Sequence, residues 1–183
     1  MAFVGTEISD VLLLERRTFE DERGTFAKVF DVAWFEDSHF KIVQVNVSHS
    51  LSKHTLRGMH FQIGNAVESK IVSCLTGRVF DVVVDLRRHS TTFLQWCGVE
   101  LSEANRRSIL IPRGCAHGFM TLEDDSRLVY LHDNLHDRNL ERGIHHLDED
   151  ISISWPESPV VVSPRDLGLP RVRQYLEEFA DEM

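Results

Sequence analysis

Short runs of β-branched and aromatic residues, separated by turn residues, dominate the hydrophobic pattern of the chain. The densest run lies at 79–86, and further runs lie at 96–101, 108–111, 127–132 and 151–155. Runs of this length and composition favour β-strands, and the Gly, Pro, Asn and Asp clusters between them favour turns. Many short strands at even spacing predict an all-β fold, either a barrel or a double-sheet jelly roll.

Helical patterns occur only at the margins of this strand-rich chain. A short helix is expected over 31–37, and a better one over 170–182. In the second segment Pro170 can open the helix, and Val172, Tyr175 and Phe179 follow at helical spacing. We therefore expect a single β-domain over 1–183 with short peripheral helices, including one at the C-terminus.

One run has a strict alternation of polar and apolar residues. Over 42–48, Gln44, Asn46 and Ser48 share one face, and three valines share the other. A polar face without charges suits the lumen of a barrel that holds a sugar or a phosphate. A solvent-facing row would have the same pattern, so both interpretations stay open at this point.

Composition and charge narrow the range of partners. The 183 residues carry a formal net charge of -9, whereas binding to nucleic acid needs a basic face. No apolar run is long enough to span a membrane, and the N-terminus lacks a signal-peptide pattern. The three cysteines are odd in number and widely spaced, which argues against a disulfide framework. We expect a cytoplasmic protein without nucleic-acid or membrane partners.

Two segments hold the residues best suited to chemistry. In 111–119, Pro112, Gly114 and His117 have the spacing of the second motif of cupin barrels, and Gly58-x-His60 is a reduced form of the first. Together, in a β-rich chain, they predict a cupin-like jelly-roll barrel with short peripheral helices.

The reduced first motif changes the expected chemistry. Many cupins bind a metal through two imidazoles, a Glu and a distal His, but here His60 is followed by Gln62, a poor ligand. A set of His60, His117 and Glu68 remains conceivable, as in a metal-dependent cupin oxygenase. The reduced motif favours instead a histidine that acts on protons, with no metal and no other cofactor.

Ordered motifs along the chain carry a resemblance to a known family. They read DERGTF at 21–26, QVNVS at 44–48, LRGMHFQ at 56–62, GRVFDVVVDLR at 77–87, AHGF at 116–119, ERGI at 141–144, DISISWP at 150–156 and SPRD at 163–166. With Lys70 between the third and fourth motifs, the chain resembles the dTDP-4-dehydrorhamnose 3,5-epimerase family from about residue 3 to residue 170.

The resemblance implies an enzyme of deoxysugar and cell-surface polysaccharide synthesis, which inverts the carbons beside the ketone of a dTDP-4-keto-6-deoxyhexose. It implies His60 as the base, Asp166 as the carboxylate that pairs with it, and Tyr130 as the acid. Lys70 would lie near the sugar ring.

The resemblance also implies a set of substrate contacts and a homodimer. The implied contacts are Arg23, Phe26, Lys28, Gln44, Asn46, Ser48, Arg57, His117, His136, Glu141 and Arg165. Arg23 is expected to reach the site of the partner subunit. The N-terminal strands, 1–50, would then serve the dimer and the substrate site, 51–160 would form the jelly-roll core, and 161–183 would form a C-terminal segment with its helix.

The physical chemistry of these side chains suits the implied roles. Imidazole abstracts protons well near neutral pH, and a carboxylate on its other nitrogen fixes the tautomer. A lysine ammonium can stabilise the enolate oxygen that develops. A tyrosine hydroxyl on the opposite face of the ring can return the proton.

Strict alternation would put Arg57 and His60 on opposite faces of their strand. A bulge at Gly58 could turn both inward, and we state this as a hypothesis. Six other histidines are assigned to the surface or to loops: His39, His49, His54, His89, His145 and His146.

Two positions depart from the family pattern. Leu135-His136 replaces a usual Tyr-Tyr pair, and 64–68 replaces a stretch with Pro-Pro and Ala-Gln. The departures leave alternatives open: a 3- or 5-epimerase acting on one carbon, a ketoisomerase, another nucleotide such as CDP or GDP, or a binding protein without catalysis.

Overall fold

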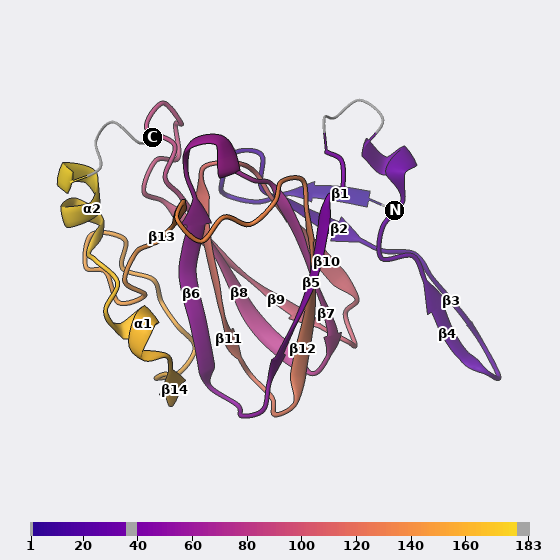
Figure 1. Ribbon diagram of the computed structural model, residues 1–183. Coiled ribbons are helices and arrows are strands. Elements are labelled where there is room, and N and C mark those ends of the chain that lie inside the picture. The colour runs from indigo at the N-terminus through magenta and orange to yellow at the C-terminus, as the bar shows by residue number, and fades with distance from the viewer. Residues whose placement is uncertain (1, 36–39, 179–183) are drawn as a thin grey trace.

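Two β-sheets face each other and form the walls of a flattened barrel (Figure 1). The computed structural model describes residues 2–35 and 40–178. In spatial order the first sheet comprises β1 (Ala2–Gly5), β2 (Leu12–Glu15), β10 (Arg107–Ile111), β7 (Lys70–Thr76), β12 (Ser126–His132) and β5 (Gln44–Ser50). The second comprises β13 (Glu141–Gly143), β6 (Thr55–Gln62), β11 (Cys115–Thr121), β8 (Arg78–Asp85) and β9 (Trp96–Ser102), with β14 (Val161–Val162) beside β6.

The remaining elements lie outside these walls. Strands β3 (Thr18–Asp21) and β4 (Gly24–Ala27) form a hairpin that projects from one side of the barrel (Figure 1). Helices α1 (Pro164–Leu167) and α2 (Val172–Glu178) lie on the other side. Two 3-10 turns, η1 (Val32–Phe35) and η2 (Gly64–Ala66), complete the elements. The predicted all-β jelly roll with short peripheral helices is confirmed.

Apolar side chains from both sheets fill part of the space between them. Val83 of β8, Ile109 of β10 and Leu128 of β12 are fully buried in one cluster. A second cluster covers the outside of the second sheet, where the Tyr175 ring of α2 meets the Phe61 ring edge-on at 5.2 Å. Burial of these large side chains stabilises the walls, and the part of the interior that they leave open holds polar residues.

Most of the expected strands are present, but the one expected over 151–155 is wrong. This segment is irregular, although Ile151 is buried as a strand residue would be. The buried carboxylate of Asp148 accepts hydrogen bonds from the backbone N–H groups of Asp150, Ile151 and Val172. A side chain therefore satisfies backbone donors that a neighbouring strand would otherwise have to satisfy.

The two expected helices are shorter where they can be observed. The first is the 3-10 turn η1, and the expectation beyond residue 35 lies outside the described residues, as does His39. The C-terminal helix begins at Val172, and Phe179 also lies outside the described part. Within residues 2–35 and 40–178, no helix has the length and apolar character needed to span a membrane.

His146 is a further correction, because it is buried and not at the surface. Its side chain is 1% exposed, and its ring stacks on that of His145 with centroids 4.5 Å apart. Its backbone carbonyl accepts a hydrogen bond from the Trp155 indole. The irregular segment that follows folds back over it, which the local sequence did not indicate.

Candidate active site

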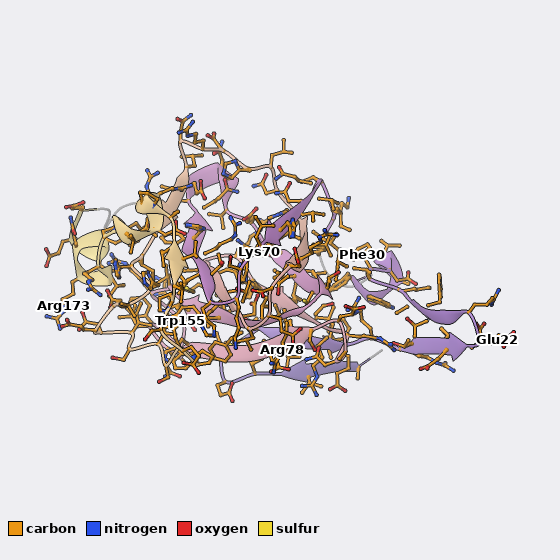
Figure 2. All side chains as sticks on the ribbon, turned by 90° about the horizontal axis from the view of Figure 1, so that it is seen from below. Glu22, Phe30, Lys70, Arg78, Trp155 and Arg173 are labelled. Atoms are coloured by element: carbon orange, nitrogen blue, oxygen red, sulfur yellow. The ribbon has the colours of Figure 1, made fainter. Side chains whose placement is uncertain are left out.

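A cavity of about 680 Å³ lies between the two sheets. Of the expected site residues, those that line it are Asn46, Ser48, Arg57, His60, Lys70, His117, Tyr130, His136, Glu141, Arg165 and Asp166. Figure 2 shows Lys70 in the interior of the barrel, whereas Glu22 lies at the tip of the distant hairpin. Residues scattered over more than a hundred positions of the sequence thus line one cavity.

An irregularity in β6 brings two of these side chains to the same side. The register pairs His60 with His117 of β11 but Arg57 with Phe119, so β6 holds one residue more than its partner there. Gly58 lies within this bulge with φ +123°, and a Cβ atom on it would lie 2.6 Å from the Cα atom of Gly118. The hypothesis of a bulge that turns Arg57 and His60 inward is confirmed.

His60 is held by a buried carboxylate. Its Nε2 lies 2.8 Å from Asp166 Oδ1, and the other oxygen of Asp166 accepts from the Gly58 N–H. Burial by itself would raise the pKa of Asp166, but the His60 contacts and this N–H hold it below its ordinary value. With an ionised acceptor on Nε2, neutral His60 carries its proton there, which leaves Nδ1 as the basic nitrogen.

Tyr130 reaches the cavity from the opposite wall, in β12. Its hydroxyl lies 3.1 Å from Ser48 Oγ on β5. Burial raises the pKa of Tyr130 above its ordinary value, and this outweighs the hydrogen bond with Ser48. The phenol therefore remains protonated at neutral pH and is available as a proton donor.

His117 forms a second imidazole–carboxylate pair, whose acidic member was not predicted from the sequence. Its Nε2 lies 2.9 and 3.0 Å from the two oxygens of Asp81, which is completely buried. The His117 ring meets the Tyr130 ring edge-on at 6.1 Å. A carboxylate at an inward position of the valine-rich strand β8 was the available signal, since charged groups are rarely buried unpaired.

Lys70 belongs to a buried cluster with two residues that had no assigned part in proton transfer. Its Nζ lies 3.0 Å from Glu68 Oε1, and Glu68 Oε2 lies 2.8 Å from Nδ1 of His132. His132 lies two residues after Tyr130 on the same strand, so the period of two was a signal for its inward position.

Two basic side chains surround the Glu141 carboxylate at the cavity. Its carboxylate lies 2.8 Å from Arg165 and 3.2 Å from His136, while Gln44 accepts from the His136 backbone N–H. Burial alone would raise the pKa of Glu141, but the hydrogen bonds from Arg165 and His136 hold it below its ordinary value. Gln44 therefore supports the cavity without lining it.

Three expected contacts lie away from the cavity of their own chain. Arg23, Phe26 and Lys28 lie in or beside the projecting hairpin, and none of them lines the cavity. The Arg23 side chain is 84% exposed and pairs only with Asp21 among the described residues. These residues cannot reach a ligand held between the sheets of the same subunit.

The alternative metal-ligand set is not assembled. Glu68 binds Lys70 and His132, whereas His60 and His117 each face a different aspartate. Among residues 2–35 and 40–178, no three His, Cys, Asp or Glu side chains are grouped so that they could hold a metal ion.

Comparisons with known proteins extend this picture. The family model described as dTDP-4-dehydrorhamnose 3,5-epimerase matches residues 5–174. The enzyme of that name from Shigella flexneri is 43% identical over 170 residues, which cover 92% of this chain and 94% of the relative. A dTDP-4-dehydrorhamnose 3-epimerase from Streptomyces niveus is 37% identical over 149 residues, 80% of this chain and 72% of the relative.

A solved structure has the same architecture. The dTDP-6-deoxy-D-glucose-3,5-epimerase RmlC from Legionella pneumophila Philadelphia 1, in complex with dTDP-4-keto-L-rhamnose, matches with a TM-score of 0.91 and 36% identity. The match covers 97% of this chain and 95% of that one. The chain with the two opposed walls described above belongs to the dTDP-4-dehydrorhamnose 3,5-epimerase family.

Proposed function

We propose that the protein is a nucleotide-sugar epimerase that removes and returns protons on the carbons beside the ketone of a dTDP-4-keto-6-deoxyhexose. The observation that carries the proposal is the placement of His60 and Tyr130 in one cavity, on strands of opposite sheets. A ring bound between the walls would offer one face to the imidazole and the other to the phenol. Inversion of a carbon requires this two-sided access.

The order of events follows from the protonation states. His60 Nδ1 takes the proton from the carbon beside the ketone, and Asp166 stabilises the imidazolium that forms. Negative charge then develops on the ketone oxygen, where the Lys70 ammonium stabilises the enolate. Tyr130 donates its proton to the opposite face of the same carbon, which completes the inversion. No step needs a cofactor.

The nucleotide half of the substrate would lie against the two arginines of the cavity. Arg57 and Arg165 line the cavity and are suited to phosphate oxygens. Named relatives act on dTDP-sugars, and one is solved with dTDP-4-keto-L-rhamnose. Both observations support dTDP as the nucleotide here. His136, in place of the aromatic expected from relatives, would stack against the base less well.

The test is incubation in D₂O with a panel of 4-keto-6-deoxy sugars linked to dTDP, CDP or GDP. NMR of the sugar carbons would show exchange of the protons beside the ketone, with the dTDP compound fastest. If no compound of the panel exchanges protons faster than in a protein-free control, the proposal is wrong.

A single-site epimerase is the second candidate, because the relative from Streptomyces niveus is a 3-epimerase. The same NMR experiment separates the two. Deuterium at both carbons indicates 3,5-epimerisation, whereas deuterium at C3 alone indicates the single-site reaction.

We further propose a homodimer in which each hairpin reaches the cavity of the partner. Phe26 on the hairpin is 69% exposed, and Val45 and Val47 on edge strand β5 are 56% and 63% exposed. Exposed apolar side chains on an edge strand favour pairing with another chain. A second copy would cover this surface and bring Arg23 near the cavity of the partner, since Arg23 does not reach the cavity of its own chain.

The compartment is a separate point. The buried free thiols Cys74, Cys97 and Cys115 support a reducing compartment such as the cytoplasm.

A further inference from the structure

A chain of hydrogen bonds connects three neighbouring strands of the first sheet. It runs from Asn46 on β5 through His132 on β12 and Glu68 to Lys70 on β7. The side chains of Glu68, Lys70 and His132 are at most 9% exposed, and all four residues line the cavity. A buried network of this kind holds its members in fixed positions only if every donor meets an acceptor.

Glu68 fixes which atoms donate and which accept along this series of hydrogen bonds. An ionised carboxylate only accepts hydrogen bonds, and each of its oxygens already has a partner. Burial would raise the pKa of Glu68, but His132 and Lys70 lower it to about 2, so Glu68 is ionised at neutral pH. Neutral His132 must then carry its proton on Nδ1.

The contact between Asn46 and His132, at the far end of the series of hydrogen bonds, agrees with this tautomer. His132 Nε2 lies 3.4 Å from the Asn46 amide nitrogen, which can donate only if Nε2 has a lone pair. At the near end, Lys70 uses one of its three N–H donors on Glu68. Among the described residues, Glu68 is the one partner of the Lys70 ammonium, so two of its donors are left for a ligand in the cavity.

We propose that Glu68 is a positioning residue, which anchors the Lys70 ammonium and fixes the Nδ1–H tautomer of His132 through its two oxygens. The inference rests on the proposed function in one respect: the anchored cation is the one that would stabilise the enolate.

The first experiment reads the tautomer by ¹⁵N NMR of the histidine rings at pH 7.5. Wild-type His132 should carry its proton on Nδ1. In Glu68→Gln the carboxamide oxygen should accept from Lys70, since the hydrogen bond from a cation is the stronger. The amide N–H₂ then faces His132, and the proton should move to Nε2. A wild-type ring that is protonated on Nε2, or on both nitrogens, would overturn the proposal.

The second experiment compares two substitutions in the solvent-exchange assay. Glu68→Ala removes the anchor of Lys70 and should lower kcat by about tenfold or more, whereas Glu68→Gln keeps an acceptor and should keep kcat within about twofold. Wild-type kcat in Glu68→Ala contradicts the proposal, and so does equal loss in both variants. Thermal melting of each variant separates these effects from unfolding.

Asp125→Asn is the matched control. It makes the same acid-to-amide change beside another imidazole, that of His49, in an exposed pair outside the cavity. It should change neither kcat nor the His132 signals. If wild type shows no exchange with any sugar nucleotide, the proposed function fails, while the tautomer measurement still decides the role of Glu68.

Discussion

The basic nitrogen of the proposed reaction is defined by a carboxylate that lies 106 residues further along the chain. Replacement of the His60 ring removes the base, while the Gly58 N–H still binds the Asp166 carboxylate. His60→Asn should lower solvent exchange at the sugar carbons by about 10² to 10⁴-fold, measured by NMR in D₂O. Binding of dTDP, followed by calorimetry, should be retained. Exchange at the wild-type rate would mean that another group is the base.

Tyr130 acts, in our proposal, after the proton has been removed. Tyr130→Phe keeps the ring and loses the hydroxyl that lies beside Ser48. Exchange of the substrate proton from the His60 side should continue, while formation of the inverted product should fall by about 10²-fold or more. Product analysis next to the exchange measurement tests this. Equal loss of both signals would contradict separate roles for the two residues.

His146 should make the stability of the protein dependent on pH. Burial, followed by the charge of neighbouring His145, lowers its pKa from 6.5 to about 4, and its Nδ1 has no partner among the described residues. The unfolded chain therefore binds the proton first as the pH falls. This contribution to stability is complete above pH 6.5, and about 3 kcal/mol is lost as the pH falls from 6.5 toward 4.

His146→Phe should remove that part of the pH dependence. Urea unfolding at pH 7 and pH 4.5 would measure it, with exposed His89→Phe as the control. The free energy of unfolding should fall less between the two pH values in His146→Phe than in wild type or in the control. The same fall in all three proteins would exclude His146 as the source.

At the scale of the element, the bulge in β6 decides which side chains share the cavity. A methyl group at position 58 would meet the backbone of Gly118 and the carbonyl oxygen of His117 at 2.6 and 2.8 Å. Gly58→Ala should lower the free energy of unfolding by about 3 kcal/mol or more, from the positive φ and the clash together. Urea denaturation measures this loss.

Gly24 provides a matched control on the hairpin. Its φ of +120° is close to the +123° of Gly58, but no atom lies within 4 Å of the position of an added Cβ. Gly24→Ala should therefore show the conformational part alone, about 1–2 kcal/mol. Equal losses in the two variants would show that the close approach of β6 to β11 contributes nothing.

At the scale of the whole molecule, the proposed dimer divides each site between two chains. Neither Arg23→Ala nor His60→Asn should be active alone, because each lacks one contributor to every site. If the hairpin serves the partner, each mixed dimer regains one complete site. That site combines the cavity of the Arg23→Ala chain with the intact Arg23 on the hairpin of the His60→Asn chain. After random exchange of subunits, activity should reach about one quarter of wild type, since half of the molecules are mixed.

A second mixture serves as the control. His60 and Tyr130 line the cavity of the same chain, so a mixture of His60→Asn and Tyr130→Phe should regain no activity. Formation of the inverted product, measured before and after subunit mixing, gives both values. A monomeric mass by analytical ultracentrifugation, or no gain in the first mixture, would contradict the shared site.

How far the sequence could predict this protein differs from part to part. Strands at 79–86 and 127–132 were predictable because alternation and β-branched residues act locally. The segment 151–155 was not, because the Asp148 carboxylate binds both the backbone N–H of Ile151 and that of Val172, which lies 24 residues further along the chain. The same holds for the site: family order pointed to His60, Lys70, Tyr130 and Asp166, but not to Asp81 beside His117.

The sequence by itself determined the strand-rich pattern, the ordered motifs and hence the family. These depend on residue types and their spacing, which the chain carries whatever its conformation. Only the folded structure revealed the other charged groups that meet: Asp81 with His117, and Glu68 with both Lys70 and His132. Asp81 and His117 lie on neighbouring strands, and Glu68 and His132 are 64 residues apart in the sequence. Whether a buried charge is compensated depends on what the packing brings within hydrogen-bond distance.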